Sequence, residues 1–297
     1  TCRVIFVGDP DQLPSVSAGN VLRDMIDSER IDVAKLDVVF RQNEESVIVK
    51  NSQKINSGDT HLVYSKKFIH CYRDNNEEIF EKASNFYVNC VKAYGIDNVV
   101  LLTPWRNKGT LCVNEFNKHL HERLNSKKSD ELTVNINNVE FRIGDKVMQT
   151  KNNYDMVYSR ENGEDGTGIF NGDMGIIESI SVRDKCMNIL FDEDKLVEYP
   201  FTNLDELDLA YAITVHKSQG SEFPIVIMPV CSFSPMLMSR NLFYTAVTRA
   251  RDMVVLVGSE KTIQNMTMNN QFHQRFTGLT EKLVAVKKFV AEKEENS

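Results

Sequence analysis

Apolar and polar positions alternate along this chain in blocks that predict helices and strands in turn. Between residues 77 and 94, apolar side chains recur every three or four positions, which is typical of an amphipathic helix. A continuous apolar run follows at Val99–Leu102 and ends at Pro104, as a buried strand ends at a turn. Helical spacing returns over residues 113–124. Strand, turn and helix in this order predict a parallel α/β sheet.

The same alternation extends to both sides of this segment. Arg3–Val7 has the pattern of a buried strand and ends abruptly at Gly8. The other predicted elements are strands at 35–40, 210–215, 225–230 and 253–257 and helices near 20–26 and 242–250. The last residues, 281–297, are rich in charge and predict a helical, fraying tail.

Glycines change the pattern in the middle of the chain. From about residue 140 they separate short runs of strand-forming residues, such as 175–180, 187–191 and 196–199. These runs predict a small antiparallel β unit. Because the α/β pattern resumes after it, we expect the β unit to be inserted between two halves of one α/β domain.

Composition narrows the class of protein. The chain has 297 residues, of which 41% are hydrophobic, so it can form packed cores and is not disordered throughout. No run approaches the ~18 apolar residues of a membrane span, so we expect no membrane partner. The six cysteines lie far apart without a C-x-x-C pair, so we expect neither metal ligands nor a disulfide framework. Free thiols fit the reducing cytoplasm, where we expect the protein to work.

The net charge of −7 is unevenly distributed along the chain. Residues 192–208 hold seven acids against one lysine, giving −6, whereas residues 101–128 hold six bases against two acids, giving +4. Local sign decides whether a groove attracts phosphate, so the acidic total does not exclude a nucleic-acid partner. Either segment taken alone is more often an ordinary solvated face.

Polar segments follow several predicted strands, where an open parallel sheet places its ligands. Gly8–Val16 contains Gln12, whose amide could orient a water or a phosphate oxygen, although a simple polar turn fits equally well. Residues 212–224 gather hydroxyls, an imidazole, an amine and a carboxamide around one glycine, which suits phosphate or sugar contacts. Arg41 and Arg249 lie in apolar surroundings, where an arginine pairs with a structural carboxylate or, less often, with a phosphate.

These segments, in this order, resemble the later motifs of superfamily-one helicases, closest to the RecD/TraA branch. The resemblance extends from Arg3 to about Gly258 and includes Thr103-Pro104-Trp105-Arg106 and Gly144-Asp145-Lys146-Val147-Met148-Gln149. It implies an α/β fold, in which a RecA-like motor domain with a parallel sheet carries an inserted, small SH3-like β-barrel. The implied parts are a C-terminal remnant of the first motor domain at 1–43, the second motor domain at 44–139 and 207–280, the SH3-like domain at 140–206, and the tail at 281–297.

The resemblance also implies roles for single residues. Gln12 would sense the γ-phosphate or its attacking water, and Arg41 and Arg249 would act as arginine fingers. The residues implied at the nucleotide are Gly8, Asp9, Gln219, Gly220 and Glu222. The residues implied at the DNA are Pro14, Val16, Thr103, Arg106, Thr214, His216 and Lys217. On this interpretation ATP with Mg²⁺ is the cofactor, and single-stranded DNA is the partner along which the protein moves.

The phosphate cradle of such an enzyme is missing from the sequence. No G-x-x-x-x-G-K-[ST] occurs, since Gly163 and Gly168 have the glycine spacing but Ile169 stands where lysine is required. No acidic pair that could hold Mg²⁺ precedes the first motif. We therefore expect the C-terminal part of a longer helicase, inactive alone and with no ATP or Mg²⁺ bound. Its expected partners are the missing N-terminal motor domain and, as candidates, other helicase or nuclease subunits.

Two alternatives stay open at this stage: an ATPase-dead module that binds single strands, and an RNA-directed helicase of the same superfamily. The resemblance implies movement from 5′ to 3′ and unwinding of duplex DNA. From the charge distribution we expect Thr103, Arg106, His216 and Lys217 to share one surface, at the ends of neighbouring strands. The acidic stretch 192–208 is expected to face away from it.

Overall fold

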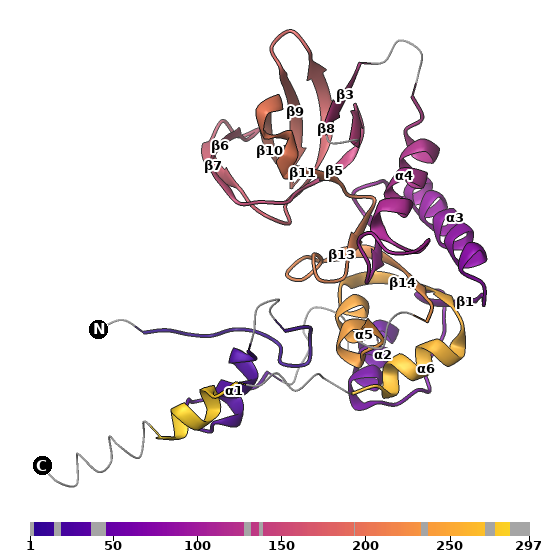
Figure 1. Cartoon of the computed structure of the whole chain (residues 1–297), viewed down its shortest axis with the longest axis vertical. Coiled ribbons are helices and arrows are strands. Elements are labelled where there is room, and N and C mark those ends of the chain that lie inside the picture. The colour runs from indigo at the N-terminus through magenta and orange to yellow at the C-terminus, as the bar shows by residue number, and fades with distance from the viewer. Residues whose placement is uncertain are drawn as a thin grey trace, which may run out of the picture. The chain divides into compact units, whose positions relative to one another are not determined.

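The chain divides into two compact units, and their helices and strands are labelled in Figure 1. The computed structural model describes residues 3–14, 19–36, 46–127, 132–136, 139–192, 194–232, 237–270 and 277–285. One unit, here called the helical unit, comprises Thr1–Val63, Ser232–Thr248 and Gln264–Ser297. The other, here called the sheet unit, comprises Tyr64–Cys231 and Arg249–Ile263.

A five-stranded parallel sheet forms the centre of the sheet unit. Its strands, in spatial order, are β1 (Phe68–Tyr72), β14 (Ala250–Gly258), β13 (Phe223–Val230), β2 (Val99–Thr103) and β12 (Ala212–Thr214). Every neighbouring pair is parallel. β2 is buried along its whole length, as expected for a parallel strand that is covered on both faces. The predicted parallel α/β sheet is confirmed.

Two predicted helices pack beside each other in the sheet unit. α3 (Asn76–Tyr94) is capped by Asn75, whose side chain accepts a hydrogen bond from a first-turn amide at 2.7 Å. α4 (Val113–Leu124) meets α3 where the rings of Phe80 and Phe116 stack, with centroids 4.6 Å apart. Figure 1 shows the two helices next to each other. Because α3 also contacts β13 and α4 contacts β12, both helices position strands of the sheet.

A seven-stranded antiparallel sheet follows α4 in the chain and precedes β12. Its strands, in spatial order, are β11 (Leu207–Leu209), β5 (Lys146–Gln149), β8 (Met174–Ser181), β9 (Cys186–Phe191), β10 (Lys195–Pro200), β6 (Asn153–Ser159) and β7 (Asp165–Ile169). A hairpin of β3 (Thr133–Ile136) and β4 (Val139–Arg142) and the 3₁₀ helix η1 (Phe201–Glu206) complete it. Phe191 and Tyr199 belong to its buried core. The predicted antiparallel β unit is confirmed.

Helices dominate the described part of the helical unit. They are α1 (Val21–Asp27), α2 (Val47–Ser57), α5 (Arg240–Val247) and the C-terminal part of α6 (Glu260–Met268). Arg240 ties three of them together, since it donates to the Thr267 carbonyl at 2.8 Å and to the Asn56 carbonyl at 3.3 Å. A cation beside helix C-termini is favourable because the last carbonyls carry partial negative charge.

The first predicted strand is absent. Arg3–Val7 is not a strand in the described structure, and Ile5 and Val7 are 85% and 92% exposed. An apolar run forms a strand only where a neighbour takes up its backbone N–H and C=O groups. The prediction of a buried strand at this segment is therefore wrong for this chain.

Other element boundaries differ from the predicted ones in smaller ways. The helix expected near 242–250 ends at Val247, and Ala250 already begins β14. The strand expected at 35–40 falls mostly outside the described residues, and of the tail only residues up to 285 are described, in helical form. Among the helices of the described ranges, none has the length and apolar character needed to cross a bilayer.

Candidate functional site

The carboxyl edge of the parallel sheet brings two polar loops together. β2 and β12 are neighbours, with Thr103 opposite Thr214. Val215 continues this pairing by donating its amide to the Thr103 carbonyl at 3.2 Å. Residues 104–112 and 215–222 therefore leave the sheet at the same edge. The expectation that these two strands are neighbours is confirmed.

Arg106, Thr214 and Lys217 line one pocket of about 780 Å³ at this edge. The Arg106 side chain is 58% exposed and pairs with Asp208 at 2.7 Å. Lys217 donates from Nζ to Asn171 of the β insertion at 3.0 Å. Burial lowers the pKa of Lys217, and the carboxylate of Asp208 opposes that effect. Two cationic side chains thus line the pocket, and each contacts a neighbouring polar side chain.

Thr103 and His216 do not lie in this pocket lining. Thr103 is fully buried, and its hydroxyl donates to the Leu111 carbonyl at 2.6 Å. The hydroxyl closes the turn after β2, so the expectation that Thr103 lies on the surface is wrong. His216 is half-buried, and its carbonyl accepts the Gln219 amide at 3.3 Å.

The acidic stretch 192–208 does not face away from the basic residues as expected. Asp205 and Asp208 line the same pocket, and Asp208 holds Arg106. The reason is connectivity, because β11 at Leu207–Leu209 leads within a few residues into β12. The end of the acidic stretch is therefore fixed beside the edge of the parallel sheet.

The loop after β12 forms a tight turn against Arg249. Gly220 has φ +85°, a left-handed conformation that a side chain would strain. Arg249 is only 7% exposed, and its guanidinium donates to the Ser221 carbonyl at 3.0 Å. Its own carbonyl accepts the Phe223 amide at 2.8 Å. Gln219 and Glu222 lie in the same turn as Gly220. Three of the residues expected at the nucleotide, Gln219, Gly220 and Glu222, therefore belong to the turn that contacts Arg249.

The loop at residues 8–14 is organised around Asp9 in the helical unit. Its carboxylate accepts the Asp11 amide at 2.9 Å and the Gln12 side chain at 3.0 Å. The hydroxyl of Tyr244 donates to the same carboxylate at 3.2 Å. The Gln12 side chain is therefore oriented by Asp9. Pro14 is described, whereas Val16 and Arg41 lie outside the described residues.

Sequence reasoning missed that α5 holds this loop. Asn241 donates to the Asp11 carbonyl at 2.6 Å, and Thr245 accepts the Leu13 amide at 2.9 Å. Asn241, Tyr244 and Thr245 follow the i, i+3, i+4 spacing of one helix face. Polar residues at this spacing in an otherwise apolar helix were the available signal.

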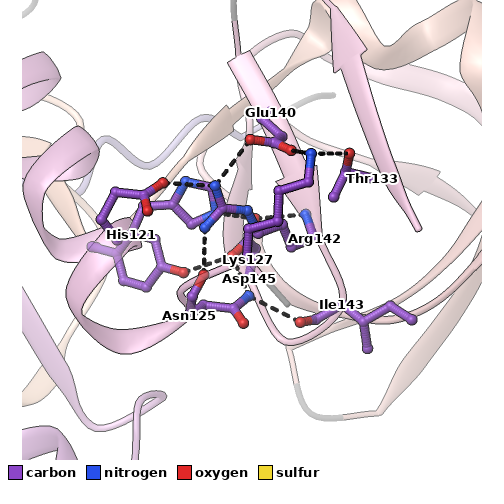
Figure 2. Close-up of polar contacts among 10 residues, drawn as sticks. His121, Asn125, Lys127, Thr133, Glu140, Arg142, Ile143 and Asp145 are labelled. Atoms are coloured by element: carbon purple, nitrogen blue, oxygen red, sulfur yellow. Dashed lines mark hydrogen bonds and ion pairs between the residues drawn. The ribbon is translucent and has the colours of Figure 1, made fainter. Parts of the chain in front are cut away.

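A set of polar side chains around the buried Asp145, here called the junction cluster, joins α4 to the β insertion (Figure 2). Asp145 is fully buried, and its carboxylate accepts the Arg142 amide at 2.8 Å and the Asn125 side chain at 2.6 Å. The Tyr211 hydroxyl donates to it at 2.8 Å, and His121 Nε2 lies 3.0 Å away. Burial, followed by the charge of Asp145, raises the pKa of Tyr211 well above its usual range.

Arg142 extends the junction cluster onto α4 and the hairpin. Its guanidinium donates to the Glu122 carboxylate at 2.6 Å and to that of Glu140 at 2.9 Å. Lys127 contacts Glu140 at 2.7 Å. Hydrogen bonds from Lys127 and Arg142 lower the pKa of Glu140 to about 2.

Lys146 makes a second link between the two folds. Its buried ammonium donates to the carbonyls of Ile96 at 2.9 Å and Val99 at 3.1 Å, just before and within β2. Burial lowers the pKa of Lys146 to about 8. The segment Gly144–Gln149, which carried part of the resemblance, is therefore a structural joint in this chain.

Each unit, taken by itself, contains a side chain of a kind that can contact phosphate oxygens. These are the Gln12 amide in the helical unit and the Arg249 guanidinium in the sheet unit. Mg²⁺ is instead held by oxygen ligands such as carboxylates and waters. The Asp9 carboxylate already accepts several hydrogen bonds, and the described ranges contain no group of three or more His, Cys, Asp or Glu side chains placed to hold a metal.

The fold is of the α/β type, with a RecA-like parallel sheet and an inserted SH3-like β domain. Family models match an AAA domain at residues 1–76, the SH3 domain of ATP-dependent RecD-like DNA helicases at 116–191, and a UvrD-like helicase C-terminal domain at 209–257. The chain is homologous to RecD2, to RecD subunits and to TraA proteins. Over most of its length it is therefore similar to helicases of the RecD/TraA type, as the resemblance indicated.

Individual relatives show how much of such a protein the chain represents. It is 33% identical over 285 residues to the ATP-dependent RecD2 DNA helicase of Deinococcus radiodurans, covering 95% of this chain and 36% of the relative. It is 26% identical over 296 residues to the RecBCD enzyme subunit RecD of Mycolicibacterium smegmatis, covering 95% and 49%. A crystal structure of Bacteroides Pif1 helicase matches with a TM-score of 0.46 at 16% identity, covering 96% of this chain and 66% of that chain. The chain spans half or less of the length of the two curated relatives.

Proposed function

We propose that this chain is the C-terminal motor part of an ATP-dependent DNA helicase. It would move from 5′ to 3′ along single-stranded DNA and unwind duplex. The observation that carries the proposal is the pocket at the carboxyl edge of β2 and β12, which Arg106, Thr214 and Lys217 line together. The kinship with proteins named as ATP-dependent DNA helicases supports the same assignment.

The pocket cations are suited to bind backbone phosphates. The ion pair of Arg106 with Asp208 is partly exposed, and exposed pairs contribute only about 0.2–1 kcal/mol. A phosphate can therefore replace the carboxylate at small cost. Lys217 sits on the next loop and offers a second cation. Phosphate contacts carry little sequence information, so binding should tolerate any base sequence.

The nucleotide roles are proposed residue by residue. Gln12, Arg41 and Arg249 would act on the γ-phosphate. The turn with Gln219, Gly220 and Glu222 would relay nucleotide state to the strand, because it joins Lys217 to the backbone carbonyl that Arg249 holds. Asp9 would orient Gln12, and Gly8 would let the loop turn.

The phosphate cradle and the Mg²⁺ ligands would come from an N-terminal motor domain. The chain has no G-x-x-x-x-G-K-[ST] sequence, so residues 1–297 alone should hydrolyse no ATP. The RecD relative is named as a subunit of an enzyme, and we therefore propose further helicase or nuclease subunits as partners. We place the protein in the cytoplasm, where its free thiols are stable.

Salt-dependent binding of single-stranded DNA by the chain tests this proposal. Arg106→Glu and Lys217→Glu should each weaken binding and flatten the plot of log affinity against log salt by about one counterion. Reversal of Asp192 and Asp194 to lysine, at exposed positions outside the pocket, is the matched control and should change little. Binding that is unchanged by both glutamate variants would refute the proposed strand path. Preference for RNA of the same sequence would favour an RNA-directed helicase.

A further inference from the structure

The inserted β domain carries an exposed aromatic pair. Tyr154 on β6 is 67% exposed, and Phe170, directly after β7, is 39% exposed. Their ring centroids lie 5.5 Å apart at an interplanar angle of 69°. The rings meet edge to face, and both still leave surface open to solvent. Exposed apolar surface that is contiguous is a feature of interaction sites, whereas single exposed apolar side chains are ordinary.

The backbone fixes the position of this pair. Gly168 has φ +104°, and a Cβ there would lie 2.6 Å from Cζ of Phe170, so the ring lies over the glycine. The Phe170 amide donates to Asp173 at 2.9 Å. On the other side, Asn152 donates to the Tyr154 hydroxyl at 3.4 Å. Rings held in this way lose little conformational entropy when a ligand stacks on them.

The aromatic pair is connected to the cationic pocket. Asn171 follows Phe170 directly and accepts a hydrogen bond from Lys217 Nζ at 3.0 Å. The Asn171 amide also donates to Asn152 at 3.0 Å, so both aromatic residues flank one hydrogen-bonded bridge. A cation beside exposed rings matches the needs of a single strand, whose phosphates require charge and whose bases require flat apolar faces.

We propose that Tyr154 and Phe170 form a base-stacking platform for the single strand whose phosphate lies on Lys217. The proposal rests on the proposed function and adds the inserted β domain to the strand-binding surface. Stacking is tolerant of sequence because every base has a π-face. The ligand is therefore a single strand of any sequence with intact bases, and a duplex, whose bases are already stacked, is excluded.

Fluorescence anisotropy with a labelled single strand tests the platform on the whole 297-residue chain. Tyr154→Ala and Phe170→Ala should each weaken binding about 5- to 150-fold, the range measured for loss of one stacking contact. Their salt slope should stay unchanged because no charge is lost. Tyr154→Phe keeps the ring and should bind like the original chain. Tyr94→Ala is the matched control, since Tyr94 is 55% exposed at the end of α3 and contributes to no part of the pocket.

A second measurement starts from the original chain, so its result can be interpreted even if an alanine variant fails to fold. A strand whose central nucleotides lack bases should bind the original chain more weakly than an intact strand. The alanine variants should not discriminate between the two strands. Failure of the original chain to bind any single strand would overturn the proposed function itself. Salt-sensitive binding that ignores missing bases and both alanine variants would overturn only the stacking platform.

Discussion

Asp145 is the centre of the junction cluster, and its removal should loosen the β insertion. Asp145→Ala leaves the Tyr211 hydroxyl and the Arg142 amide without their acceptor in a fully buried place. Each orphaned donor costs about 1–3 kcal/mol. His121 also loses the carboxylate 3.0 Å from its ring. We expect a total destabilisation of about 3–5 kcal/mol, in the range found when one partner of a buried polar pair is removed.

Hydrogen–deuterium exchange measured by mass spectrometry isolates this effect from the rest of the chain. Peptides that cover β5 and β11 should lose protection by about 100- to 4,000-fold in Asp145→Ala, because each 1.4 kcal/mol corresponds to a factor of ten. Asp145→Asn keeps an acceptor for the Tyr211 hydroxyl, so these peptides should lose less protection from exchange in this variant. Asp155→Ala, at an exposed position of β6, is the control and should leave these peptides unchanged. Unaltered protection of β5 in Asp145→Ala would refute the argument that the cluster joins the two folds.

Three further outcomes follow from the geometry. The pKa of Lys146 is about 8 in the folded chain against its ordinary 10.5, so the unfolded state binds more protons between these values. The free energy of unfolding should therefore rise with pH across that window by up to about 3 kcal/mol, and Lys146→Met should remove this rise in pH-resolved urea titrations. Gly58→Ala should destabilise the helical unit by more than 1 kcal/mol in the same titrations, because Gly58 has φ +83° and its Cβ would lie 2.6 Å from the Arg240 guanidinium; an Ala variant of full stability would contradict the geometry. In the proposed longer helicase, Arg249→Lys should lower kcat for ATP by roughly 10³–10⁵-fold with little effect on nucleotide affinity, and near-normal turnover would show that Arg249 has a structural role, as in its hydrogen bond to the Ser221 carbonyl.

Elements with strong periodicity could be predicted from the sequence. α3, α4 and β2 follow from the spacing of apolar residues alone, because each buries one face or both faces against its neighbours. The β insertion followed from glycines that separate short alternating runs. Arg3–Val7 has an equally strong pattern and yet forms no strand, since strand formation depends on a neighbour that periodicity cannot reveal.

The candidate site was predictable only in part. The neighbouring strands β2 and β12 placed Arg106 and Lys217 at one edge, as their apolar runs indicated. The ion pair between Arg106 and Asp208 could not be predicted. The net charge of residues 192–208 does not indicate which of their acids lies beside the parallel sheet. The role of Thr103 inside the turn likewise depends on the backbone path and not on residue type.

The most direct test of the central claim is ATP-driven unwinding by the proposed longer helicase. A forked duplex with a single-stranded 5′ tail should be separated when ATP and Mg²⁺ are present, and a duplex with only a 3′ tail should not. Lys217→Glu should slow unwinding at physiological salt because the strand is bound more weakly. Unwinding that proceeds from either tail, or that is indifferent to Lys217→Glu, would contradict the proposed motor and its strand path.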